Sequence, residues 1–460
     1  MKWSLVKFVA VFLTLTTTAF CQLSNMDFNG SGARAEGMGK AYLAVSDDIS
    51  AVSWNPAGLF VFEKPVIGFS YSTLLPRGSY EYAGNKEDQS GSFSEISMLS
   101  FLAPLRLKGH HFVLAGCYGK AFDEFQNSIY DTSFVYSDSL NEAADAYLTQ
   151  NTEYEGGPFV INFGFGTRVY DKISFGFSTN LYTGKAENVT LTKTTIDSLE
   201  RTDSYNQEIY YEEDVSIYDT VKFSGVNFTL GFKYNSEKLN AGLIIKTPYD
   251  LKVTTDRSIY TVTKYNGLVK TNWTDTIFVD DILQKVEIPM IIGLGGAYNV
   301  TDNFLVSMDL EYRHFEDHMV NTRTSFSIQP GGDKEETYVE EDPMWQDVMT
   351  LRLGAEYNWE TGSRLFPEVP LRVGFGYLPL SSSELRIDTI TLYDSLFQVV
   401  TTRKTSGVNF SAGMGVHWTQ IYLDFAWSYS TYDKNNDIVG NEQALKNRNH
   451  HFNLTFTGYF

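Results

Sequence analysis

The sequence has little basic charge, almost no cysteine and no long apolar run beyond its N-terminus. Only 2 of its 460 residues are Cys, which excludes a disulfide scaffold and a Cys-rich metal site. Lys and Arg number 36 against 56 Asp and Glu, so the formal net charge is −20. This balance argues against a nucleic-acid partner and against a polybasic membrane-docking surface. Because no run of about 18 apolar residues follows the N-terminus, a helical membrane span is also excluded.

The composition is rich in aromatic residues and glycine. There are 33 Phe, 29 Tyr and 36 Gly, and 43% of the residues are hydrophobic, which is enough to bury a core. The mean hydropathy is −0.22. These features leave two classes of protein, a secreted all-β protein and an outer-membrane β-barrel.

Residues 1–21 have the three-part pattern of a secretory signal peptide. A basic start is followed by an apolar stretch over residues 8–15, too short to span a bilayer, and then by small and polar residues. We predict cleavage after Cys21, which leaves Cys117 as the one cysteine of the mature chain. A lipoprotein acylated at Cys21 is the alternative, but bulky Phe20 stands where such signals require a small residue.

Apolar and polar residues alternate along most of the mature chain. Over residues 351–359, one face carries Leu351, Leu353, Ala355, Tyr357 and Trp359, and the other carries Arg352, Gly354, Glu356 and Asn358. This period of two indicates β-strands rather than helices. The polar face mixes small residues with charges that look buried, such as Asp309, Arg313, Arg352 and Glu356. Aromatic residues often end the strands, as expected for the girdles of a membrane barrel.

Short and long connections between the predicted strands alternate. Residues 235–238 form a short connection, for example, whereas residues 250–285 form a long polar one. Alternation of this kind is typical of up-and-down membrane barrels, which have short periplasmic turns and long external loops. The fold class predicted is therefore all-β, a transmembrane antiparallel barrel over residues 65–460. About fourteen strands are expected, starting near residues 65, 96, 110, 158, 172, 222, 237, 286, 303, 348, 368, 405, 420 and 450.

Residues 22–64 do not alternate and predict a compact N-terminal plug in the barrel lumen. The segment Asn55-Pro56-Ala57-Gly58 is the part expected to matter most, since Pro fixes φ, Asn can hold a turn and Gly allows close passage. We predict a plug or gating role for Asn55, Pro56, Ala57 and Gly58. A purely structural anchor remains the alternative.

The predicted plug carries a signature of three motifs: residues 32–41, Ser46-Asp47-Asp48 and Trp54-Asn55-Pro56-Ala57-Gly58-Leu59. This plug signature resembles that of the long-chain fatty acid transporter (FadL-like) family of outer-membrane proteins. Weaker matches to the same family lie at residues 292–298, 308–312, 351–357 and 371–377. The plug signature is similar as well to that of the barrel proteins of the type IX secretion system.

This resemblance implies a fourteen-stranded monomeric barrel, a lumenal plug and passive uptake of hydrophobic molecules such as long-chain fatty acids or aromatic hydrocarbons. The family's lateral gap lies in its third strand, where Gly116 and Gly119 are candidates for a strand kink or lateral opening. The family's pocket residues lie in loops that this sequence does not match, so no ligand-contacting residue is predicted. The alternative function is that of an outer-membrane component of a type IX-like secretion system.

No enzymatic activity is predicted, because the chain has no nucleophile elbow, His-Glu-x-x-His motif or P-loop. We expect no catalytic residue, metal or cofactor. The partners predicted are a hydrophobic small molecule, outer-membrane lipid and lipopolysaccharide, and the outer-membrane assembly machinery, which would recognise the last strand ending in Phe460. The location predicted is the outer membrane of a Gram-negative bacterium.

Overall fold

The computed structural model describes residues 30–82, 85–121, 126–138, 141–200, 208–266, 270–326, 335–392, 395–438 and 441–460. The predicted signal peptide, Cys21 and the beginning of the predicted plug lie outside these residues. In the described part of the chain, no helix is long and apolar enough to cross a membrane.

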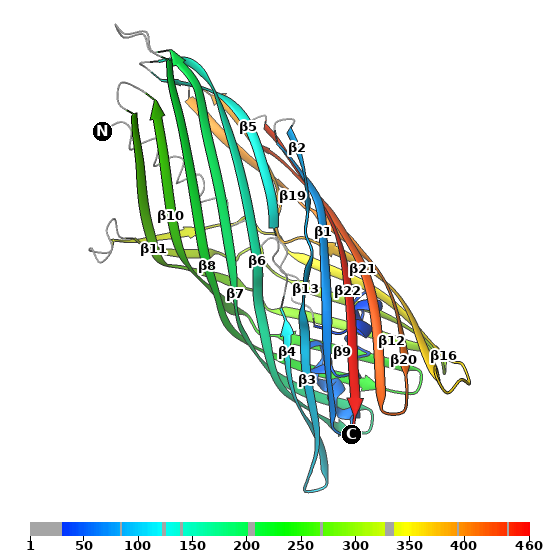
Figure 1. Cartoon of the computed structure of the whole chain (residues 1–460). Helices are drawn as coiled ribbons and strands as arrows, with labels where there is room; N and C mark the ends of the chain where they lie inside the picture. The colour runs from blue at the N-terminus through cyan, green and yellow to red at the C-terminus, as the bar shows by residue number, and fades with distance from the viewer. Residues whose placement is uncertain are drawn as a thin grey trace.

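Fourteen strands close an antiparallel barrel (Figure 1), which confirms the predicted fold and strand number. Each strand pairs with the next around the ring, and the last pairs with the first along almost its whole length. In ring order the strands are β1 (Val66–Tyr82), β3 (Phe93–Leu107), β4 (His110–Lys120), β6 (Asn141–Tyr170), β7 (Ile173–Glu200), β8 (Glu208–Asn235), β9 (Leu239–Lys246), β12 (Ile291–Thr301), β13 (Phe304–Arg313), β16 (Val348–Glu360), β17 (Glu368–Pro379), β20 (Ser406–His417), β21 (Ile421–Ile438) and β22 (Asn441–Tyr459).

Much of what the sequence indicated as long polar loops is β-structure that continues the barrel wall outward. For example, residues 250–285 lie almost entirely in the β10–β11 hairpin, where Val and Thr, which suit extended backbone, alternate with charged residues. The further strands beyond the ring are β2 (Asn85–Ser90), β5 (Gln126–Asp138), β10 (Tyr249–Asn266), β11 (Lys270–Ile288), β14 (Val320–Phe326), β15 (Glu335–Glu341), β18 (Glu384–Leu392) and β19 (Ser395–Arg403).

The outer wall carries the apolar members of the alternating pairs. Leu353 and Trp359 of β16 are 40% and 54% exposed, whereas Arg352 of the same strand is 1% exposed and faces inward. The charges that the sequence suggested were buried, at Asp309, Arg313, Arg352 and Glu356, are indeed buried. The apolar side faces lipid and the polar side faces the lumen, as in membrane barrels generally.

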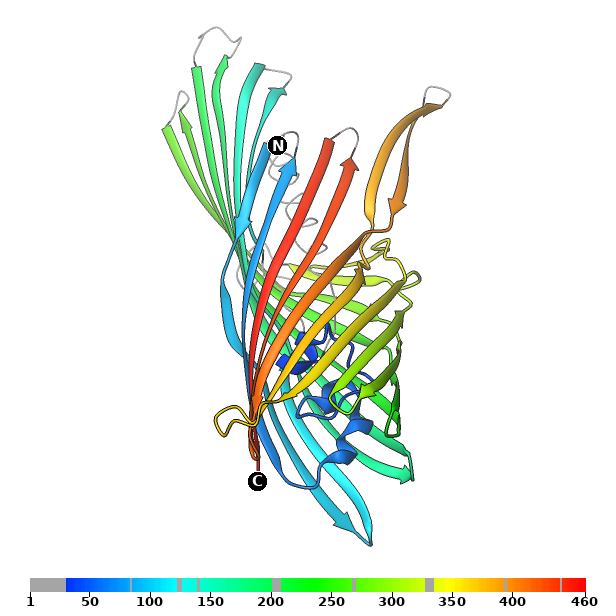
Figure 2. The ribbon, with the colours of Figure 1, turned by 90° about the vertical axis from the view of Figure 1, so that its right-hand side faces the viewer.

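Residues 30–62 lie inside the barrel, and we call them the lumenal segment. It contains α2 (Ala33–Gly37), α3 (Ala51–Trp54) and the 3₁₀-helix η1 (Pro56–Val61). Figure 2 shows this dark-blue segment enclosed by the strands in the half of the barrel that holds the C-terminus. Most of its residues are buried, and β1 begins at Val66 shortly after it.

Candidate functional site

The Asn55 side chain connects three parts of the molecule. Its Oδ1 accepts a hydrogen bond from the backbone N–H of Ala57 at 3.1 Å, which caps η1. Its Nδ2 donates to the carbonyl of Leu43 at 3.0 Å and to that of Phe232, on β8, at 3.2 Å. Asn55 therefore holds the turn before η1 and ties it to the barrel wall.

Glycines allow the lumenal segment to lie directly on itself and on the wall. A Cβ atom added at Gly58 would lie 1.7 Å from the carbonyl oxygen of Ser46, closer than any real contact. On β7, a Cβ at Gly176 would lie 2.2 Å from the carbonyl carbon of Pro56. The predicted residues Asn55, Pro56, Ala57 and Gly58 are thus all buried against their surroundings.

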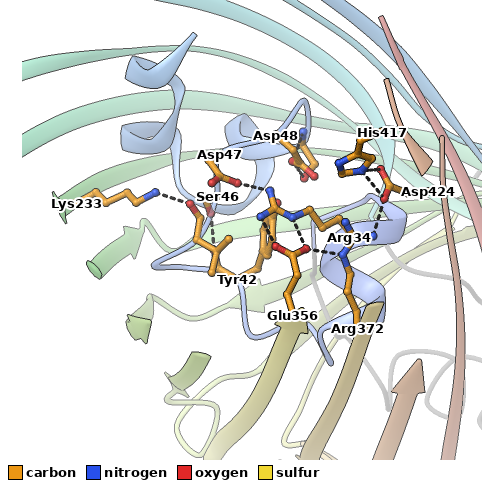
Figure 3. A network of polar contacts seen from close by, with 12 residues as sticks. Arg34, Tyr42, Ser46, Asp47, Asp48, Lys233, Glu356, Arg372, His417 and Asp424 are labelled. Carbon is orange, nitrogen blue, oxygen red and sulfur yellow. Dashed lines mark hydrogen bonds and ion pairs between the residues drawn. The ribbon is translucent and has the colours of Figure 1, made fainter. Parts of the chain in front are cut away.

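A chain of buried ion pairs joins the lumenal segment to the opposite wall (Figure 3). Arg34 of α2 donates two hydrogen bonds of 2.8 Å to Glu356 on β16 and also pairs with Asp47. Arg372 on β17 donates to Glu356 at 2.5 Å and to Asp424 on β21 at 2.6 Å. His417 on β20 lies 3.1 Å from the Asp424 carboxylate. Glu356 therefore holds one end of the segment, and side chains of β17, β21 and β20 extend the network along the wall through charge-assisted bonds, which are among the stronger hydrogen bonds in proteins.

Backbone groups of the lumenal segment also find partners on inward-facing side chains. Asp309 on β13 accepts hydrogen bonds from the N–H groups of Tyr42 and Leu43 at 2.5 and 2.8 Å. Ser307 on the same strand donates to the carbonyl of Ala41 at 2.9 Å, and Lys233 on β8 donates to that of Val45. Polar side chains of the wall thus satisfy the segment's irregular backbone, as buried peptide groups require.

Beyond the lumenal segment, toward the outer end of the barrel, the inner wall becomes apolar. The rings of Tyr182 and Tyr249 stack with centroids 4.8 Å apart, and those of Phe315 and Trp345 meet edge to face at 5.6 Å. We call the buried cluster around them the lumenal apolar cluster, which comprises Ala121, Tyr154, Val160, Tyr182, Ala186, Val221, Phe223, Leu251, Val253, Val286, Ile288, Phe315, Val320, Trp345 and Val348, with Tyr249 packed against it.

A polar belt separates this cluster from the lumenal segment on one side of the barrel. Asn162 on β6 donates to the side chain of Asn180 on β7 at 2.7 Å, and Asn180 donates to that of Asn227 on β8 at 2.7 Å. All three asparagines are buried and face the lumen. An apolar molecule that passed from the cluster to the segment would therefore meet a step in polarity.

Gly116 and Gly119 lie in β4, where the pairing is regular. β4 pairs with β3 and with β6 through both glycines without a register shift. The irregularity in this part of the wall lies between β1 and β3, where the register shifts at Ser70 and Tyr71 and leaves Ser97 of β3 without a partner residue on β1. Cys117, between the two glycines, is buried with a free thiol.

The histidines take part in no candidate metal site within the described ranges. His111 bonds to the carbonyl of Phe62 at 2.9 Å. At the outer end of β13, His314 lies 2.8 Å from the Asp347 carboxylate, which also accepts a 2.7 Å bond from Tyr312. The hydrogen bond that His314 donates to the Asp347 carboxylate, together with the charge of that carboxylate, raises the pKa of His314 above the ordinary value of 6.5.

The model of the family described as "Outer membrane protein transport protein (OMPP1/FadL/TodX)" matches residues 13–457. The chain belongs to this family. It is therefore an outer-membrane transport protein of a Gram-negative bacterium and not an enzyme, as the sequence predicted. No curated protein sequence matches it.

Solved structures of this OMPP1/FadL/TodX family share the fold. A Pseudomonas aeruginosa FadL homologue is 12% identical, with a TM-score of 0.60 over 95% of this chain and 99% of its own. The P. putida toluene transporter TodX is 14% identical, with a TM-score of 0.57 over 94% and 99%. The monoaromatic hydrocarbon channel CymD is 15% identical, with a TM-score of 0.56 over 95% and 99%.

The sequence indicated the segment Asn55–Gly58 and the buried charges of the barrel wall. It did not indicate that the lumenal segment is joined to those charges. Arg34 and Glu356 are 322 residues apart, and their contact depends on strand register. The lumenal apolar cluster was also missed, because much of it lies in segments interpreted as solvated loops. A signal was present in the alternation of Leu251 and Val253 with charged Lys252.

Proposed function

We propose that this OMPP1/FadL/TodX family member carries hydrophobic small molecules, such as long-chain fatty acids or aromatic hydrocarbons, passively across the outer membrane. The observation that carries the proposal is the lumenal apolar cluster, which presents stacked aromatic rings on the inside of the barrel. Ligand sites for apolar molecules are lined in this way. Two solved structures of the same fold are named as a toluene transporter and a monoaromatic hydrocarbon channel. The family match favours transport over the type IX-like secretion alternative.

In this proposal the lumenal segment acts as a plug. It fills the lumen below the apolar cluster and is held by the Arg34–Glu356 pair and by Asn55. A ligand can pass only if this segment rearranges or if the wall opens sideways. The barrel closes within one chain, so we propose that it acts as a monomer, assembled through recognition of its last strand, which Phe460 follows.

The test is uptake of a radiolabelled long-chain fatty acid and of toluene by a bacterial host that lacks its own transporter. The wild-type chain is expected to restore uptake of at least one of them. Phe315→Ser, which removes an aromatic ring from the cluster, is expected to lower uptake several-fold, because a polar group replaces apolar surface. Phe366→Ser is the matched control, since Phe366 is exposed in the turn between β16 and β17. Equal uptake in cells with and without the wild-type protein would refute the proposal.

A further inference from the structure

Four lysines lie on the outward face of four neighbouring strands, just beyond the apolar band. Lys185 on β7 lies directly opposite Lys222 on β8, and Lys252 on β10 lies directly opposite Lys285 on β11. All four are exposed, while the residues that alternate with them, such as Val221 and Val286, are buried toward the lumen. We call these four residues the lysine row.

The lysine row lies at one level of the membrane. On the barrel, Lys222 pairs with Thr254 and Ser224 with Lys252, so the second lysine pair is offset from the first by two residues. The strands of a barrel tilt by about 35–45°. Residues at the same depth in the membrane are therefore displaced along the strand by about one residue from each strand to the next. The periplasmic ends of the strands shift in the same direction around the barrel. Ile173, the first residue of β7, pairs with Tyr234, and β8 continues beyond that residue; Leu239, the first residue of β9, pairs with Tyr298, and β12 likewise continues beyond it.

That level is the outer edge of the lipid bilayer. On β8 the outward residues Phe232, Phe228 and Val226 are 39–48% exposed and form the apolar band, and Lys222 lies four residues beyond Val226. On the β11–β12 wall, Lys285 lies five residues beyond Met290, which is 46% exposed. Four residues of tilted strand rise by about 10 Å, which places the ammonium groups among the lipid headgroups.

Like charges directly opposite each other on a sheet destabilise it unless a counter-ion is present. Lys222 has one in Asp256, at 2.9 Å, and Lys185 has one in Glu187, at 3.0 Å, on the solvent side of the row. Within the described residues, no carboxylate lies within 4.0 Å of the ammonium group of Lys252 or Lys285. Asp250 and Glu287 face each other one step nearer to the apolar band. Among the residues that the structure describes, the Lys252–Lys285 pair is therefore the part of the row without a carboxylate in salt-bridge contact.

We propose that the lysine row binds the phosphate groups of lipid A in the outer leaflet of the membrane. A lipid A molecule supplies what this surface lacks, since its acyl chains would cover the apolar band and its phosphates would lie between the ammonium groups. The lysine ammonium group binds phosphate as a point charge. Several lysines in a row therefore distribute positive charge along the wall. Because the chain as a whole has a net charge of −20, the lysine row is a local basic surface on an otherwise acidic protein.

The test measures binding of purified lipid A to the folded full-length protein in detergent, by native mass spectrometry. Lys252→Gln combined with Lys285→Gln is expected to raise the apparent Kd by about 30-fold, since each lysine near an anionic lipid surface contributes a factor of about five. Lys172→Gln combined with Lys238→Gln, in the exposed periplasmic turns, removes the same charge and is expected to leave the Kd unchanged. Heat-modifiable migration on gels verifies that each variant is folded.

Two further lipids define the ligand. Lipid A stripped of its phosphates is expected to bind wild type as weakly as intact lipid A binds the Lys252/Lys285 variant, and phosphatidylglycerol is expected to bind more weakly than lipid A. An unchanged Kd in that variant, or equal loss in the control, would overturn the proposal. Equal binding of phosphatidylglycerol would overturn the assignment to lipid A. Hydrophobic uptake by the Lys252/Lys285 variant is expected to equal that of wild type, so this test and the transport test fail independently.

Discussion

Arg34 and Glu356 form a bidentate ion pair inside the barrel, with two nitrogen-to-oxygen distances of 2.8 Å. Glu356 also accepts a hydrogen bond from Arg372, so one carboxylate bridges two guanidinium groups that are largely removed from water and whose other partners are Asp47 and Asp424. Removing one partner of a buried ion pair leaves the other charges uncompensated, which is far more costly than the pair itself is stabilising.

Glu356→Gln is therefore expected to lower the free energy of unfolding by about 3–5 kcal/mol. Guanidinium-induced unfolding of the protein in phospholipid micelles measures this loss. Glu360→Gln, at the exposed end of the same strand, serves as the control and should change the free energy by less than about 1 kcal/mol. Equal effects of the two substitutions would show that the ion pair does not anchor the lumenal segment.

Gly58→Ala is expected to displace η1, because the new methyl group would overlap the carbonyl oxygen of Ser46. If the lumenal segment seals the barrel, this displacement should increase ionic conductance in planar bilayers several-fold. Gly296→Ala is the matched control, since a Cβ atom there meets nothing within 4 Å. Conductance equal to wild type in a folded Gly58→Ala protein would contradict a sealing role for this segment.

A disulfide across β4 tests the proposed lateral opening near Gly116 and Gly119. Cys117 lies directly opposite Ser100 on β3 and Asn162 on β6, and directly opposite residues are close enough for a disulfide. If ligands leave through a gap beside β4, oxidation of Ser100→Cys or of Asn162→Cys should lower uptake, and reduction should restore it. The reduced form of each variant is its own control. Undiminished uptake in each of the two oxidised variants, measured separately, would place the exit elsewhere.

The His314–Asp347 pair predicts a pH-dependent contribution to stability at the outer end of β13. Because the pKa of His314 is raised in the folded protein, this contribution is complete below the ordinary value of 6.5 and disappears as the pH rises through the folded-state pKa. His314→Gln should therefore lower Tm at about pH 5.5, where Asp347 is ionised, and have little effect at about pH 9. His110→Gln, at an exposed turn, should show no such dependence. A Tm difference that does not change with pH would contradict the assigned ion pair.

The barrel could be predicted from the sequence because strand alternation is a local pattern. Residues 351–359 alternate clearly, and they lie in β16 with Arg352 and Glu356 inward as expected. The outward continuation of the wall was not predicted, since Thr255 and Arg257 occupy inward positions of β10 and break up its apolar pattern, and a polar stretch that faces water on one side resembles a loop.

The candidate site likewise has a part that the local sequence predicts and a part that it does not. Asn55 and Gly58 belong to one short motif whose turn chemistry is visible in the sequence. The Arg34–Glu356 pair and the lumenal apolar cluster depend on the register of strands far apart in the chain. Register follows from pairing around the whole barrel, which local composition does not specify.

The central claim is that a hydrophobic ligand enters the lumen at the apolar cluster above the lumenal segment. A crystal structure with a terminally brominated long-chain fatty acid tests it most directly, because the bromine is located by its anomalous signal. We expect a bromine peak inside the barrel, among Tyr182, Tyr249, Phe315 and Trp345. Bromine found only on the outer wall, with none in the lumen, would contradict it.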